Sequence, residues 1–227
     1  AHTSSNSYPN TISQLMKHKP YLLRVLTIIS TGLLMVLLAG VAAGQEDAAQ
    51  STVAVSSTSV TTDDGVVVTV QARDENGDAI SDGGATVVIN STGSGLIFGV
   101  TDLRDGTYTA SLSNSTAETV TITATLNGAA VAGAADPTVT FSPGAADASL
   151  STRAVSNTSA TTDGTVTVTV QAIDQHGNTI TTGGDTVTIT STSSGSVSIV
   201  ADNADGTYTA TLADTVAETV TVSAKLN

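Results

Sequence analysis

The sequence predicts an all-β protein in which two antiparallel β-sandwiches follow one another along the chain, and three observations predict it. The chain repeats itself after one hundred residues, so that Ser51–Ile80 aligns with Ser151–Ile180 and Ala117–Asn127 with Ala217–Asn227 without a gap. Within each repeat apolar residues alternate with threonine at a period of two, which is typical of half-buried strands. Clusters of Asn, Asp and Gly separate the alternating segments at intervals of about 8–12 residues, as turns do in a sandwich.

The length of the repeat indicates whole domains. Solenoid repeats have periods of about 20–50 residues, whereas a compact domain has roughly 100. We therefore expect a first domain over residues 48–141, a linker over 142–149 and a second domain over 150–227.

The residues before the repeats have the pattern of an export signal. Residues 1–15 are polar, and we expect them to be an upstream or disordered segment before a start at Met16. Basic residues follow Met16, then an apolar run through Val25–Ala39 and small residues at Gly40–Gly44, which predicts a signal peptide over 16–44. The alternative is a retained signal anchor, because the apolar run approaches the roughly 20 residues that span a bilayer. Either way we expect a secreted or cell-surface protein that meets a membrane only through this segment.

Charge and cysteine content narrow the function classes. The formal net charge is −13, and every Asp and Glu lies from Glu46 onward. Nucleic acid and anionic lipid are therefore not expected partners, because both are bound by patches of Lys and Arg. The chain has no cysteine, so each domain has to fold through buried apolar area without disulfides.

The strands of the first repeat follow in order from the alternation. Val66–Ala72 sets three valines and an alanine on one face and is followed by a turn at 74–78. The later segments alternate through Val87 and Ile89, then through Tyr108, and then through Val120. The remaining expected strands are Thr86–Asn90, Thr107–Leu112, Glu118–Leu126 and Pro137–Phe141.

The second repeat stops at Asn227, the equivalent of Asn127, before a counterpart of Pro137–Phe141. We therefore expect that the second domain lacks its last strand and is the less stable of the two, because an uncovered edge leaves main-chain groups unpaired. On the same ground we expect the chain to be a fragment of a longer array.

The segment Asp-Gly-Thr-Tyr-Thr-Ala occurs in both repeats and predicts the type of sandwich. Immunoglobulin-like domains carry a tyrosine just after a turn, where its ring covers the end of the core and its hydroxyl bonds to the main chain. Gly106 and Gly206 supply the turn, and Tyr108 and Tyr208 are expected to be structural. The alternative, Tyr108 as a ligand platform or catalytic acid, lacks a neighbouring histidine or convergent charge.

These segments resemble a known family. The stretches VTVQARDENGDAI, DGTYTASL with AETVTITATLNG, and DPTVTFSPGAADASLS look like the bacterial Ig-like modules of the invasin/intimin adhesins. DNADGTYTATL at Asp202–Leu212 is also similar to filamin repeats. The resemblance covers roughly Ala48–Asn227 and implies tandem Ig-like domains of a bacterial adhesin.

No catalytic constellation is apparent, and we expect no enzyme. After the leader the chain has one histidine, His176, in a turn, and one lysine. No triad or zinc site can be assembled from one histidine and no cysteine. Few exposed aromatics are available for a sugar platform, and the three Asn-x-Ser/Thr sequons are interpreted as chance matches in a chain rich in Ser and Thr.

Calcium is the one cofactor left open. The segment Asp74–Ala85 begins like an EF-hand loop but has alanine in place of both the turn glycine and the bidentate glutamate. A surface or inter-domain site is the remaining hypothesis; its candidate ligands are Asp63, Asp64, Asp74 and Asp78.

Together these observations predict an extracellular or cell-surface protein whose Ig-like modules form a stalk or an adhesive array. Its partners would be a surface receptor of unknown identity or neighbouring modules of the same array. The alternative is a pair of accessory modules, binding carbohydrate or protein, in a larger secreted enzyme.

Overall fold

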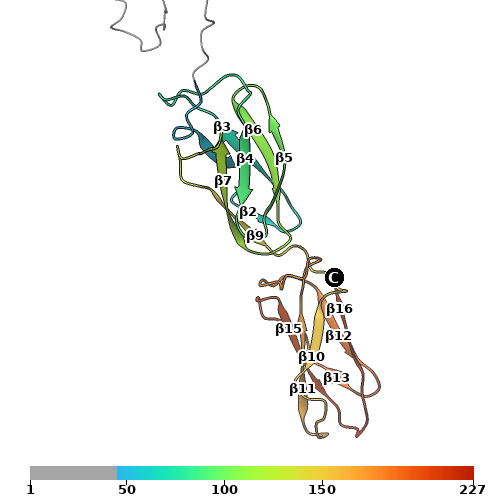
Figure 1. The fold of residues 1–227 in the computed structure, drawn as a ribbon. Helices are drawn as coiled ribbons and strands as arrows, with labels where there is room; N and C mark the ends of the chain where they lie inside the picture. The colour runs from blue at the N-terminus through green and yellow to red at the C-terminus, as the bar shows by residue number, and fades with distance from the viewer. Residues whose placement is uncertain (1–44) are drawn as a thin grey trace, which may run out of the picture. The chain divides into compact units, whose positions relative to one another are not determined.

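The computed structural model describes residues 45–227 (Figure 1). The predicted segments at 1–15 and 16–44 lie outside the described residues. All regular structure in 45–227 is β-strand, which confirms the all-β prediction. Within that range no helix has the length and apolarity needed to cross a membrane.

The first module consists of two sheets around one core, whose buried residues run from Ala48 to Phe141 (Figure 1). The first sheet has the order β1-β3-β6-β5; its strands are β1 (Thr52–Val55), β3 (Val66–Gln71), β6 (Thr107–Ser113) and β5 (Leu96–Asp102). The second has the order β2-β9-β7-β4, with β8 added beside β7; its strands are β2 (Ser59–Thr61), β9 (Thr138–Ser142), β7 (Thr119–Leu126), β4 (Val87–Ser91) and β8 (Ala129–Ala130).

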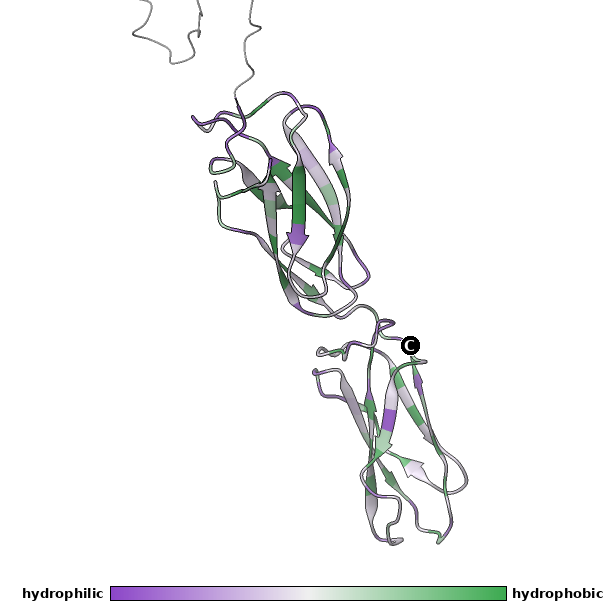
Figure 2. Ribbon diagram, viewed as in Figure 1, coloured by the Kyte–Doolittle hydropathy of each residue, from purple (hydrophilic) through white to green (hydrophobic). Residues whose placement is uncertain are grey.

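The period-two alternation of the sequence places the core. In β6 every second residue from Tyr108 to Leu112 is buried, and the threonines and serines between them are not. The strands β3 and β7 alternate in the same way, so that green and pale positions follow one another along strands of the first module in Figure 2. β-Branched residues on a pleated surface thus bury one face and solvate the other.

Several features of the first module were not predicted, among them the short strands β1, β2 and β8. β2 pairs with β9 in parallel, with Val60 beside Phe141, whereas the sequence suggested antiparallel strands throughout. β5 is a seven-residue strand paired with β6, and it was missed because its apolar residues are nearly contiguous. A contiguous run gives no clear period of two.

The second module, residues 150–227, repeats the first sheet and has a smaller second sheet. Its first sheet has the order β10-β11-β15-β13, with β14 also on β15, and its second consists of β12 and β16. These strands are β10 (Thr152–Val155), β11 (Thr165–Gln171), β12 (Val187–Ser191), β13 (Ser196–Val197), β14 (Ala201–Asp202), β15 (Thr207–Ala213) and β16 (Val222–Leu226).

The cores of the two modules differ where their second sheets differ. Val120 and Ile122 of β7 are fully buried in the first module, where β9 covers them with Val139 and Phe141. Their equivalents in the second module, Val220 and Val222, are only partly buried.

Candidate functional site: the joint between the modules

The joint between the two modules is organised by one buried aspartate. Asp174 lies in the turn after β11 and has no exposed surface. Its Oδ1 accepts hydrogen bonds from the main-chain N–H groups of His176 (2.9 Å) and Asn178 (2.8 Å), which closes the turn. Its Oδ2 accepts from the Thr62 hydroxyl of the first module (2.8 Å) and from the N–H of Gly144 in the linker (2.9 Å). One carboxylate therefore connects the second module, the linker and the first module.

The hydrogen bonds on Asp174 keep it ionised. Burial alone would raise the pKa of this carboxyl group, because the charged form loses its hydration. The side chain of Asn178, the N–H groups of Gly144 and Asn178 and the Thr62 hydroxyl outweigh burial and hold the pKa of Asp174 well below its ordinary value near 3.8. A buried charge that is this fully hydrogen-bonded fixes the position of its donors.

A second aspartate holds the joint from the side of the first module. Asp63 accepts at Oδ1 from the Gln175 side-chain amide (2.6 Å) and at Oδ2 from the N–H of Ala145 (3.1 Å). The Nε2 atom of His176 lies 3.4 Å from the same Oδ1, and both side chains are about one-third exposed. The Gln175 and Ala145 hydrogen bonds lower the pKa of Asp63.

Asn178 makes the third link. Its Nδ2 donates to the carbonyl oxygen of Ser115 (2.9 Å) and to Asp174 Oδ2 (2.8 Å), and its Oδ1 accepts from the N–H of Ala117 (3.0 Å). Both Ser115 and Ala117 belong to the loop between β6 and β7 of the first module. An amide is suited to this place because it donates and accepts at once.

The linker is bound along much of its length. Ala146 forms an isolated antiparallel bridge with Asp174, and the N–H of Asp147 donates to the carbonyl oxygen of Ile173 (2.7 Å). Gly144 lies so close to the Asp63 carboxylate that a side-chain methyl group there would overlap with it. This explains why the linker carries glycine at that position.

A shallow cleft lies beside these contacts, between the modules. Residues of β7 and β9 line it from the first module, the linker adds Pro143, and the second module contributes residues at the end of the 174–178 turn. Its lining residues include Glu118, Phe141, Pro143, Asn178 and Thr181.

The candidate calcium ligands are not brought together. Asp63 is engaged in the joint, and Asp64 accepts a hydrogen bond from Thr61 (2.8 Å). Asp74 closes its own turn by accepting from the N–H groups of Asn76 and Asp78. Within 45–227 the structure gathers no group of three or more metal-ligating side chains.

Both predicted structural tyrosines lie in the cores. Tyr108 is buried, and its hydroxyl accepts from the N–H of Ala85 (2.9 Å). Tyr208 does the same with Asp185 (2.9 Å) and also donates to the carboxylate of that residue (3.2 Å). Burial raises the pKa of both tyrosines.

The two turn glycines are required by the main chain. Gly106 and Gly206 have φ angles of 80° and 81°. A side chain at either position would also collide with a carbonyl group, that of Ile80 in the first module and that of Ile180 in the second.

Most of the joint was not predicted from the sequence. His176 was expected to lie in a turn, and no role was predicted for Asp174, Asn178 or Thr62. A signal was present, because the turn differs between the repeats: Glu75, Asn76 and Asp78 of the first are Gln175, His176 and Asn178 in the second. The second turn therefore carries two fewer carboxylates than the first, at the positions where it faces the first module.

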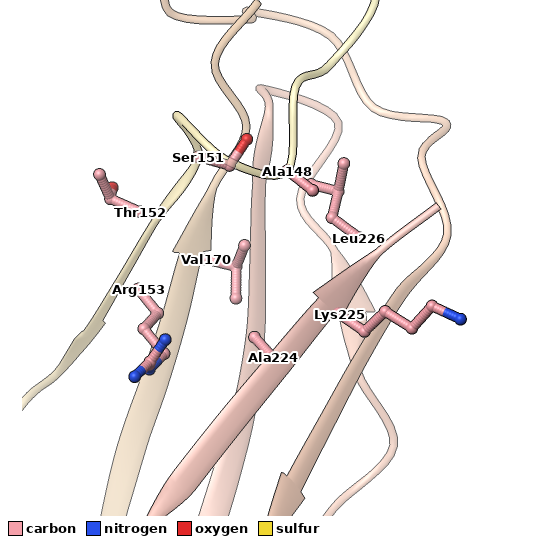
Figure 3. Close-up of a pocket in the computed structure, with 8 residues that line it drawn as sticks. All are labelled: Ala148, Ser151, Thr152, Arg153, Val170, Ala224, Lys225 and Leu226. Atoms are coloured by element: carbon pink, nitrogen blue, oxygen red, sulfur yellow. The ribbon is translucent and has the colours of Figure 1, made fainter.

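The second module also has a pocket, between β10 and β16 (Figure 3). Val170, Ala224 and Leu226 contribute apolar walls, and the ammonium group of Lys225 points away. In the first module the equivalent place is filled by Val131, which is buried and donates its N–H to the carbonyl oxygen of Ala124 (2.9 Å).

Comparison with known proteins gives a consistent result. The family model for invasin domain 3 matches residues 47–144 and again 147–227. Among solved structures, invasin, described as a bacterial integrin-binding protein, is 30% identical with a TM-score of 0.59, covering 80% of this chain and 38% of its own. InvD of Yersinia pseudotuberculosis is 28% identical with a TM-score of 0.52, covering 80% and 54%.

A third structure supports the fold. The Escherichia coli adhesin FdeC has a TM-score of 0.56 at 23% identity, covering 80% of this chain and 61% of its own. The chain thus spans less than two thirds of each of these three proteins. A filamin domain of Lin-41 matches at 20% identity with a TM-score of 0.35. No curated protein matches.

Proposed function

The chain belongs to the invasin domain 3 family, and on that premise we propose that it is part of a bacterial cell-surface adhesin in which the two Ig-like modules form a stiff stalk. Invasin is an integrin-binding protein, and that activity is stated for invasin alone. For this chain we propose the general role of presenting a binding surface for a partner outside the cell. None of the three proteins named above is described as an enzyme, and we propose no catalytic role.

The main observation in support of a stiff stalk is that the Asp174 carboxylate accepts hydrogen bonds from both modules. A flexible tether would leave the module surfaces hydrated, and their polar groups would bond to water. Here a fully buried carboxylate accepts from Thr62 of one module and from its own turn in the other. Separating the modules would break the hydrogen bond from Thr62 and expose the carboxylate to water, whereas in the docked joint its hydrogen bonds hold the donors from both modules in fixed positions.

The orientation of the modules can be measured with two spin labels. The chain has no cysteine, so Thr123→Cys on β7 and Thr188→Cys on β12, both exposed, give one label in each module. We expect a single narrow distance distribution from electron–electron double resonance, because the joint fixes both modules.

A matched pair of variants tests whether the hydrogen bonds of the joint cause the narrow distance distribution. Asp174→Ala removes the shared acceptor and should broaden the distribution. Asp74→Ala removes the equivalent turn aspartate of the first module, whose carboxylate has no hydrogen bond to the second module, and should leave the distribution narrow. A broad distribution in the unsubstituted chain, or equal widths in the two variants, would refute the stiff stalk.

A further inference from the structure

An exposed apolar surface lies on the first module, at the free edge of its first sheet. β5 pairs with β6 on one side and is the last strand of the order β1-β3-β6-β5, so its other edge presents unpaired main-chain groups. Leu96 is 61% exposed and Phe98 51% exposed, and Val100 and Leu103 are similarly open. Figure 2 shows β5 at the side of the first module, with hydrophobic colour along it.

The surface extends across the sheet. Phe98 lies opposite Ser111 of β6, and Ser111 lies opposite Val67 of β3, which is 48% exposed. Neighbours in such a row are about 5 Å apart on the same face. Phe98 and Val67 therefore flank a small serine, and together they form a shallow apolar strip on the outer face.

The second module shows that the sandwich does not need these side chains. At the positions of Leu96, Phe98 and Val67 it carries serine or threonine, namely Ser196, Ser198 and Thr167. Its edge strand is also reduced to the two-residue pieces β13 and β14.

The polar residue at the equivalent of Phe98 is used internally. The Ser198 hydroxyl accepts from the N–H of Thr211 (2.9 Å), and its own N–H donates to the carbonyl oxygen of Thr211 (2.9 Å). The second module therefore has a short edge whose polar side chain bonds to the neighbouring strand, whereas the first has a longer edge strand with apolar side chains. The fold does not account for this difference.

We propose that the β5 edge of the first module is a docking site for an extended segment of a partner protein, which adds to the sheet as a further strand. The segment carries apolar side chains at alternate positions, to cover Leu96 and Phe98, and Lys or Arg at its flanks. Main-chain pairing provides affinity in this recognition mode, and the alternate side chains provide specificity.

Charge selects this partner over a second copy of the chain. Residues 48–141 hold ten Asp and Glu side chains against two Arg, and Asp102 and Asp105 lie at and just beyond the end of β5. Two copies would bring these like charges together, whereas a basic segment is attracted to them. The bulge between Phe98 and Thr101, where Gly99 has a φ of 70°, limits regular pairing to Leu96–Phe98.

This surface is separate from the joint, and the proposal does not rest on the stalk function. The probe is a synthetic peptide, KKVTFTVKK, titrated into the isotope-labelled chain and followed by amide NMR shifts. We expect the largest shifts at Leu96–Phe98. The peptide EEVTFTVEE, with the same core and opposite charge, should bind at least tenfold more weakly. A KKVTFTVKK peptide N-methylated at alternate residues should also lose binding, because it keeps its side chains but cannot complete the ladder.

Variants complete the test. The double variant Leu96→Ser, Phe98→Ser carries the residues that the second module has at these positions, so we expect it to fold. Its melting curve checks this. It should reduce binding of the peptide at least tenfold. Ile199→Gly removes the most exposed apolar side chain of the second module and should leave binding unchanged. Equal binding by the double variant, equal binding of the Glu peptide, or shifts located elsewhere would overturn the proposal. Sedimentation that shows a dimer lost in the double variant would identify a second copy as the occupant, and would also overturn it.

Discussion

The substitution Asn178→Asp tests the joint most directly, because it gives the second turn the residue that the first turn carries at Asp78. The side chain keeps nearly the same shape, and its oxygen can still accept from the N–H of Ala117. It can no longer donate to the carbonyl oxygen of Ser115 or to Asp174, which the Asn178 amide reaches at 2.9 and 2.8 Å. Instead it places a second carboxylate beside the buried one.

The magnitude follows from these contacts. A hydrogen bond between neutral groups contributes about 1 kcal/mol, and one to a charged acceptor roughly 1.5–3 kcal/mol. Repulsion between two carboxylates about 4 Å apart would add up to about 4 kcal/mol at an effective dielectric constant of 20. Because Asn178 is partly exposed, the new carboxylate can turn toward solvent and escape most of this repulsion. We expect a net loss of about 3 kcal/mol at pH 7 in the stability of the docked joint.

The loss should shrink in acid. The pKa of the introduced carboxyl group is raised in the folded state by its neighbour, so its unfavourable charge is removed as the pH falls through that raised pKa. The pKa of Asp174 and that of Asp63 are both lowered, so the stability they contribute is present above the pKa of an unfolded aspartate and is lost only below it. The unsubstituted joint should therefore stay intact at pH 4.5.

The assay combines the spin-label distance with a denaturant melt at pH 7 and pH 4.5. Asn178→Asp should broaden the distance distribution at pH 7 and partly recover at pH 4.5, and Asp78→Asn is the matched control with no effect. If Asn178→Asp and the unsubstituted chain behave alike at pH 7, or if the penalty is the same at both pH values, the hydrogen-bond account of the joint is wrong.

Three further predictions concern the modules themselves. Tyr108→Phe should cost about 1–2 kcal/mol in a denaturant melt, because the N–H of Ala85 loses its acceptor, and Tyr108→Ala roughly 3–5 kcal/mol through the cavity it leaves; equal costs would contradict this. Gly206→Ala should destabilise by at least about 2 kcal/mol, because φ is positive and the new methyl group meets the carbonyl of Ile180; an unchanged melting curve would refute the strain. Calorimetry should show the second module melting first, and a copy of residues 128–142 appended after Asn227 should raise its melting temperature by several degrees by filling the pocket of Figure 3; two coincident transitions would count against it.

The sequence predicted the parts of the fold that depend on alternation. Tyr108 and the valines of β3 could be placed in the core, because a period of two assigns each residue to one face. The parallel pairing of β2 with β9 could not be foreseen, because β2 has only three residues and its partner is about 80 positions away. β5 was missed because its outer face is apolar, and this same departure from the pattern marks the proposed docking site.

The joint was harder to predict than the cores. Asp174 looks like any turn aspartate, because the Asx turn it closes is formed equally by Asp74 in the first module. What distinguishes them is the second carboxylate oxygen of Asp174, which bonds to Thr62, 112 positions away. A local pattern carries no information on a contact that depends on how one domain meets the next.

The differences between the two turns make the modules non-interchangeable in spite of their similar sequences. If a unit with the first type of turn were inserted after another copy of itself, Glu75 would take the place of Gln175 opposite Asp63, and Asp78 the place of Asn178. Carboxylates would then face one another where amides now donate. The residues of the turn therefore determine which module can follow which. An array with the modules in another order would still fold each module, but the joint with the first type of turn would not be held rigid.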